Sequence, residues 1–361
     1  MLTKKTTPPH GGGPSGPPLP APPASRGRAA LLGALLAGGL LALCLLSLGL
    51  GALSIPPGQV VDALLGNPVG ERVGNIVWSV RVPRTGLALA AGAAMGLSGA
   101  VMQALTRNPL ADPGILGVSA GASFAIVLAA GVFGLGSLLG QVWFAFAGAL
   151  IAAVVVYLLG QLGRSGPTPV KLALAGIAVT SVLSSLTSAI VLTEPEALDR
   201  FRFWSAGSLA DQDGATVVRM LPFLALGAVL ALAAAPALNS LALGDDVATS
   251  LGRRLGLIRL QGVAAITLLT GASVAAIGPV VFLGLVVPHA ARSLAQYTGR
   301  GPDQRLLLPL SAALGAALLL AADLLGRLVA RPTEVQAGLI IAFIGGPFFI
   351  ALVRRRKLAE V

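Results

Sequence analysis

The sequence predicts an all-α, polytopic membrane protein with about ten transmembrane helices. Of its 361 residues, 55% are apolar and only 11% are charged, whereas a soluble domain needs about 25% charged residues to cover its surface. The mean hydropathy is +0.86. The charged residues lie between long apolar runs, and about 20 helical residues suffice to cross a bilayer core of about 30 Å. Such runs fill so much of the chain that little room remains for a soluble domain.

The N-terminal segment differs in composition from the rest of the chain. Residues 1–28 contain eight prolines, five glycines and almost no apolar side chains, so we expect a disordered cytoplasmic tail. The apolar run 29–53 is longer than the hydrophobic region of a typical signal peptide, and it is predicted to be the first spanning helix.

Nine further apolar runs complete a predicted transmembrane domain over 29–353, and a short basic cytoplasmic C-terminus, 354–361, follows it. An even number of spans puts both termini on the same side of the membrane. The nine runs are 85–105, 115–133, 141–162, 170–192, 216–235, 260–277, 280–297, 306–328 and 336–353.

The distribution of basic residues predicts which side that is. If the N-terminus lies in the cytoplasm, the cytoplasmic segments hold 17 of the 25 Lys and Arg residues and the outer segments hold eight. Because cytoplasmic loops of membrane proteins are enriched in Lys and Arg, we expect both termini inside, in the inner (cytoplasmic) membrane. The strongly basic balance then indicates contact with membrane lipid and no nucleic-acid partner.

The sequence lacks the residues that several energy sources and reactions require. None of the four lysines follows a glycine, so the chain has no G-x-x-x-x-G-K-[ST] phosphate loop and is not expected to be an enzyme. A secondary transporter needs intramembrane carboxylates or histidines. Only Asp323 lies well inside an apolar run, and Arg327 at i+4 suits a local ion pair. With two histidines and one cysteine, no metal site and no cofactor are predicted.

Five stretches carry a family resemblance, namely 81–122, 203–209, 241–252, 278–292 and 322–349. In these stretches the chain resembles the FecCD-type permeases of ATP-binding-cassette (ABC) importers, which move ferric siderophores, haem and cobalamin. The resemblance implies the type II ABC importer permease fold. It also implies three kinds of partner: a second permease subunit (identical or a paralogue), two ATPase subunits and an extracytoplasmic substrate-binding protein.

The longest predicted cytoplasmic connection, 236–259, carries two acidic residues at a helix start, followed by apolar residues at helical spacing. Acidic side chains favour the positive end of a helix dipole, and an apolar stripe offers a docking face. An interfacial helix resting on lipid headgroups is the alternative. The resemblance implies that this connection enters a groove on the ATPase. The implied coupling residues are Asp245, Asp246, Val247, Ala248, Leu251 and Gly252.

The helix expected over 170–192 concentrates hydroxyl side chains on one face, because they recur at i, i+3, i+4 and i+7. Such hydroxyls either pack helix against helix or form a weakly polar pore wall. The resemblance implies that this helix lines the pathway between two permease subunits, and that a threonine just before it lies near the cytoplasmic gate. The candidate pathway residues are Thr168, Thr180, Ser181, Ser184, Ser185 and Ser188.

Three arginines near the predicted outer face, Arg81, Arg84 and Arg327, are implied by the resemblance to dock the binding protein. A planar guanidinium can meet a carboxylate through two parallel hydrogen bonds. Snorkelling of these side chains to lipid headgroups is the alternative.

Two proline motifs are interpreted as structural. Asn108 before Pro109 favours an extended turn after the second span. Pro288 loosens the backbone hydrogen bonding of its helix, and His289 could satisfy a freed carbonyl.

The cargo is predicted to be a ferric siderophore, ahead of haem and cobalamin. A hydroxyl-lined helix without metal-binding side chains suits a chelate that arrives with its iron already coordinated. The segments 200–214 and 241–252 also resemble the siderophore branch of the family. A secondary transporter and a membrane scaffold for an ATPase are the alternatives from other classes.

Overall fold

The computed structural model describes residues 26–51, 55–135, 138–162, 168–210, 214–299 and 301–357. Within these ranges the chain forms helices and their connections, without a strand. The elements are α1 (Arg26–Gly49), α2 (Pro57–Leu65), α3 (Glu71–Asn75), the π-helix η1 (Ile76–Arg81), α4 (Val82–Thr106), the 3₁₀-helix η2 (Pro113–Leu116), α5 (Val118–Gly131), α6 (Leu138–Gln161), α7 (Pro169–Thr193), α8 (Pro195–Ser205), α9 (Gly214–Ala233), α10 (Ala235–Ala242), α11 (Asp245–Ser250), α12 (Leu255–Ile277), α13 (Leu283–Tyr297), α14 (Gln304–Val329) and α15 (Ala337–Lys357).

Each of the ten predicted spans coincides with one of these helices, namely α1, α4, α5, α6, α7, α9, α12, α13, α14 and α15. Among the described residues, seven helices are long and apolar enough to cross a membrane. The helices α5 and α15 add shorter apolar stretches, and α13 is a 15-residue helix with Pro288 inside it. The predicted all-α membrane fold is therefore confirmed.

The helix boundaries differ from the predicted ones mainly at the two ends of the domain and at prolines. Most of the predicted tail, residues 1–25, lies outside the described residues, and α1 already begins at Arg26. At the other end, α15 continues to Lys357, into the segment predicted to be a separate C-terminus. The second span belongs to a continuous 36-residue helical stretch, Glu71–Thr106, in which the π-helix η1 leads directly into α4 just before Pro83.

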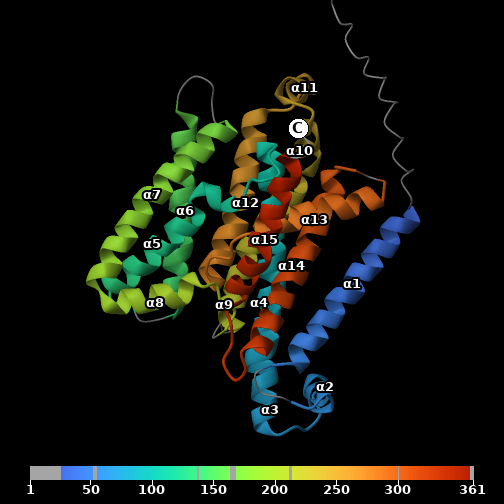
Figure 1. The fold of residues 1–361 in the computed structure, drawn as a ribbon, viewed down its shortest axis with the longest axis vertical. Helices are drawn as coiled ribbons and strands as arrows, with labels where there is room; N and C mark the ends of the chain where they lie inside the picture. Colours follow the sequence, from blue (N-terminus) through green and yellow to red (C-terminus); the bar gives the residue numbers. More distant parts are fainter. Residues whose placement is uncertain are drawn as a thin grey trace, which may run out of the picture.

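Helix α4 lies in the middle of the bundle and packs against α9, α12, α13 and α14 (Figure 1). Glycines allow these close approaches. A Cβ atom added at Gly99 would lie 2.0 Å from the carbonyl oxygen of Gly284 on α13, and one added at Gly92 would lie 2.5 Å from that of Gly315 on α14. Small residues let helix backbones approach closely where lipid supplies no hydrophobic driving force.

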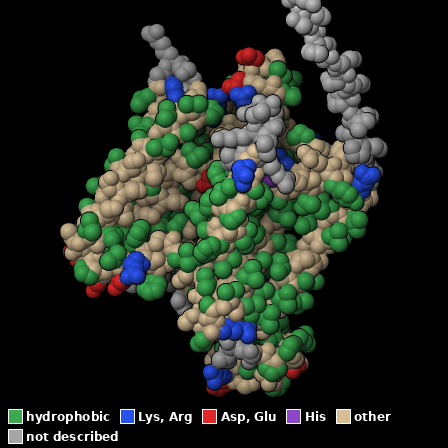
Figure 2. Space-filling view, viewed as in Figure 1, with side chains coloured by type: hydrophobic (Ala, Val, Ile, Leu, Met, Phe, Trp, Pro, Cys, Tyr) green, Lys and Arg blue, Asp and Glu red, His purple; other side chains and the backbone are tan. Residues whose placement is uncertain are grey.

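The two sides of the bundle are less enclosed. Helices α5 to α8 form one flank, α1 lies on the opposite flank, and α10 and α11 lie at the end opposite to α2 and α3 (Figure 1). Figure 2 shows apolar side chains over the sides of the molecule and charged side chains mostly near the ends of the helices. A surface of this kind suits lipid and partner subunits instead of water.

Candidate functional site

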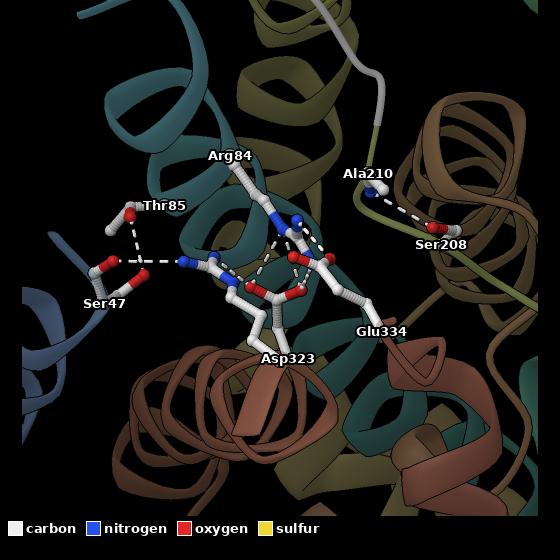
Figure 3. A network of polar contacts seen from close by, with 8 residues as sticks. Ser47, Arg84, Thr85, Ser208, Ala210, Asp323 and Glu334 are labelled. Carbon is white, nitrogen blue, oxygen red and sulfur yellow. Dashed lines mark hydrogen bonds and ion pairs between the residues drawn. The ribbon is translucent and has the colours of Figure 1, made fainter. Parts of the chain in front are cut away.

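At the α2–α3 end, four charged side chains form one cluster. Arg84 in the first turn of α4 places Nη2 2.7 Å from Oδ1 of Asp323 on α14, and Nη1 2.8 Å from Oε2 of Glu334 in the α14–α15 connection (Figure 3). Arg327 also pairs with Asp323, one turn earlier on α14. The ion pair expected from the i,i+4 spacing is therefore confirmed. The two partners of Arg84 are 239 and 250 positions away in the sequence, so no local pattern indicates them.

Arg327 of this cluster and the nearby Arg81 also cap the end of α1. Arg81 Nη1 donates to the carbonyl oxygens of Leu48 at 2.6 Å and Gly49 at 2.9 Å, and Arg327 Nη1 donates to that of Ser47 at 3.0 Å. The last carbonyls of a helix have no partner within the helix. Cationic donors at this end also complement the negative end of the helix dipole.

The three arginines predicted to dock a binding protein are therefore not free surface side chains. All three are buried, and only 2% of the surface of Arg327 is exposed. Together with Arg72 and Glu334 they line a cavity of about 230 Å³ at this end of the bundle. Docking through these arginines stays a prediction, and it requires a partner side chain that reaches into the cavity.

At the opposite end, the predicted coupling residues divide between two faces of α11. Asp245 forms ion pairs with two arginines of this chain. Oδ1 lies 2.7 Å from Arg107 Nη2, and Oδ2 lies 2.7 Å from Arg259 Nη2. Ala248 is fully buried. Asp246 and Gly252 are exposed, and Gly252 has a φ of +76° just after the helix.

The outward face of this segment is apolar. Leu243, Val247 and Leu251 follow one another at i, i+4 and i+8, and they are 64%, 42% and 59% exposed. Leu243 extends the predicted set, but Gly244, with a φ of +109°, breaks the helix between Leu243 and Val247, so the two are not related by helical spacing. The segment therefore combines an exposed apolar stripe with a partly exposed, charged attachment.

The hydroxyl face of α7 is exposed along the flank of the bundle. Ser181, Ser185 and Ser188 each donate a hydrogen bond of 2.9 Å to the backbone carbonyl four residues earlier. Their hydroxyls are thus satisfied within α7, and these three side chains and that of Ser184 are exposed. Thr180 is half-buried. The face is polar enough to contact water and offers no charge.

The residue predicted near the gate caps α7. Thr168 is the N-cap residue, and its Oγ1 accepts a hydrogen bond of 3.3 Å from the backbone amide of Lys171. A threonine in this position satisfies one of the free amides of the first turn. Its role at a gate stays a prediction.

The two proline motifs lie in the α4–η2 connection and inside α13, and their structural role stays a prediction. Asn108 Oδ1 accepts a hydrogen bond of 3.0 Å from the amide of Leu110, which closes the turn around Pro109. The ring of His289, next to Pro288, lies edge-on to Phe348 at 5.6 Å between centroids. A bond from His289 to a freed carbonyl stays a prediction.

Comparison with known proteins extends over nearly the same residues as the bundle. The profile of the FecCD transport family matches residues 39–355. The chain is 48% identical to the ferric enterobactin transport system permease protein FepD of Escherichia coli (strain K12), over 86% of this chain and 91% of that protein. It is 40% identical to the iron(3+)-hydroxamate import system permease protein FhuB of Bacillus subtilis (strain 168), over 86% and 79% of the two chains.

A solved structure has the same fold. It is an inward-facing conformation of a metal-chelate type ABC transporter, which superposes with a TM-score of 0.78 at 28% identity. The match covers 91% of this chain and 99% of the other.

Proposed function

This chain belongs to the FecCD transport family, and from that premise we propose that it is the permease subunit of an ABC importer that carries a ferric siderophore across the inner membrane. The observation that carries the proposal is the 48% identity to a ferric enterobactin permease over most of both chains. The hydroxyl face of α7 supports it, because a neutral, weakly polar wall suits a large chelate whose iron is already coordinated. Haem and cobalamin are the alternative cargoes.

The pathway itself is proposed to lie between this chain and a second permease subunit. Helix α7 is largely unburied within the described chain, and its serines already satisfy their hydrogen bonds locally. A second copy of the chain, or a paralogue, facing α7 would enclose a passage that holds cargo weakly and so releases it.

ATP hydrolysis is proposed to occur in two separate ATPase subunits that bind the outward face of α11. The exposed stripe of Leu243, Val247 and Leu251, on α11 and its two flanks, supports this, because exposed apolar side chains suit burial in a groove of a partner. The first residues of α1 and the last of α15 lie at the same end as α11 (Figure 1). This arrangement supports an orientation with both termini and the ATPases in the cytoplasm.

An extracytoplasmic binding protein is proposed to dock at the opposite end, where Arg81, Arg84 and Arg327 line the basic cavity. A carboxylate of that protein would complete the hydrogen bonding of the arginine cluster. Because the serines of α7 discriminate little between chelates, cargo selection is proposed to reside in the binding protein.

Iron uptake in a deletion strain tests the cargo. Cells with and without this gene receive radiolabelled iron as a catecholate chelate, a hydroxamate chelate or haem, and labelled cobalamin in a fourth arm. We expect loss of chelate uptake alone. Normal chelate uptake with loss of haem or cobalamin uptake would contradict the siderophore assignment, and uptake by reconstituted permease driven by an ion gradient without an ATPase would contradict the importer class.

A further inference from the structure

The carboxylate of Asp245 binds two helices at once. Its two oxygens take separate partners, Arg107 at the end of α4 and Arg259 in the first turns of α12, each at 2.7 Å. Hydrogen bonds between charged partners are roughly twice as strong as neutral ones. Asp245 therefore joins the start of α11 to two helices of the bundle, while 34% of its side chain remains exposed.

Helix α11 needs such an attachment because it cannot hold its own position. It has six residues, far fewer than the roughly 12 to 15 at which an isolated helix becomes marginally stable. Glycines with positive φ angles bound it on both sides, Gly244 at +109° and Gly252 at +76°. Its orientation therefore comes from tertiary contacts, which are the buried Ala248 and the ion pairs of Asp245.

These attachments lie on the side of α11 away from the exposed stripe. Asp245 and Ala248 are spaced i,i+3 on one face, while Val247 and Leu251 are exposed on the other. Fixing the inner face thus fixes the direction in which the apolar stripe points. Asp199 on α8 is also an exposed carboxylate, and it lies away from α11, so it serves as a matched control.

Helix α4 extends the attachment to the other end of the molecule. From Arg84 to Arg107 it covers about 35 Å at a rise of about 1.5 Å per residue. Arg84 belongs to the charged cluster with Asp323 and Glu334, and Arg107 holds Asp245. A displacement of α11 therefore acts on a helix that ends in the proposed docking cavity for the binding protein.

We infer that Asp245 is a positioning residue that makes the outward face of α11 move as one body with α4 and α12. It transmits movement between the ATPase and the bundle, and it does not contact the ATPase. The inference rests on the proposed function, in which the ATPase binds this face of α11. It assigns to Asp245 a role different from that of Val247 and Leu251.

The test uses the whole importer in proteoliposomes, with its ATPase, its binding protein and a ferric catecholate as cargo. The variants are Asp245→Asn, Arg107→Gln and, as the matched control, Asp199→Asn. Arg107→Gln leaves the sequence of α11 unchanged, so its effect cannot come from a lost contact between Asp245 and the ATPase. The readouts are ATPase copurification, ATP hydrolysis stimulated by the binding protein, and cargo transported per ATP.

We expect Asp245→Asn and Arg107→Gln to retain the ATPase but to transport about fivefold less cargo per ATP, the lower end of coupling between linked sites. Asp199→Asn should match the wild type. Wild-type transport per ATP in both Asp245→Asn and Arg107→Gln would overturn the inference. Loss of ATPase copurification in Asp245→Asn but not in Arg107→Gln would also overturn it. Retention of the ATPase by Leu251→Arg would instead refute the proposed docking face itself.

Discussion

Arg84 and Asp323 form a buried ion pair that joins the first turn of α4 to α14 across 239 positions of the sequence. The guanidinium donates to the carboxylate through Nη2 at 2.7 Å and through Nε at 3.0 Å. Asp323 also pairs with Arg327, so one carboxylate serves two arginines. The pair fixes the end of the bundle in which the docking cavity lies.

Asp323→Asn is expected to lower the stability of the protein by about 3–5 kcal/mol, because removing one partner leaves a buried charge uncompensated. Thermal unfolding in detergent measures the change. Glu334→Gln serves as the control, because the Glu334 side chain is 29% exposed and Arg84 keeps its ion pair with Asp323. Equal midpoints for Asp323→Asn and the wild type would contradict this account.

Glu334→Gln is expected to strengthen docking of the binding protein, because it removes a carboxylate that already occupies Arg84. Arg84→Glu should weaken docking by repelling the same carboxylate of the partner. Titration of the labelled binding protein against reconstituted permease measures both affinities. The wild-type affinity should fall as salt rises, because ions at 0.1 M screen the attraction between approaching charges that are more than about 10 Å apart. Unchanged affinity in both variants would remove the arginine cluster from the docking site.

Leu251→Arg is expected to abolish association with the ATPase while the permease stays folded in the membrane. The side chain is exposed at the apolar stripe of α11, so the fold does not depend on it, whereas a buried charge in the interface lacks a partner. Copurification from membranes measures the association. Leu198→Arg on α8, at the other end of the molecule, is the matched control and should bind normally. Normal ATPase binding by Leu251→Arg would show that this face does not dock.

Gly99→Ala is expected to destabilise the bundle by about 1–3 kcal/mol, the usual cost of overpacking a core. The added Cβ atom would lie 2.0 Å from the backbone oxygen of Gly284, so α4 and α13 must separate. Gly86→Ala on the same helix is the control, because no other atom lies within 4 Å of its added Cβ. Thermal unfolding compares the two variants, and equal effects would contradict the proposed close packing of α4 and α13.

The transmembrane spans and the Asp323–Arg327 pair follow from the sequence by local physical rules. A helix that crosses lipid must satisfy its backbone internally and present apolar side chains over its length, so each span is encoded within its own residues. Residues at i and i+4 are neighbours on any helix, so the ion pair needs no tertiary information. The expected partners follow from the family resemblance, and the motifs that carry it are continuous stretches of sequence.

Only the tertiary structure decided which polar residues meet and which of them remain accessible. Arg84 meets Glu334 across 250 positions, and Asp245 meets Arg107 across 138 positions, so their pairing depends on how the helices pack. The arginines predicted on the outer face are buried by that packing, and Ala248 turns inward while its neighbour Val247 remains exposed. Residue type and spacing determine which side chains can form an ion pair or a docking stripe, but burial is a property of the assembled bundle.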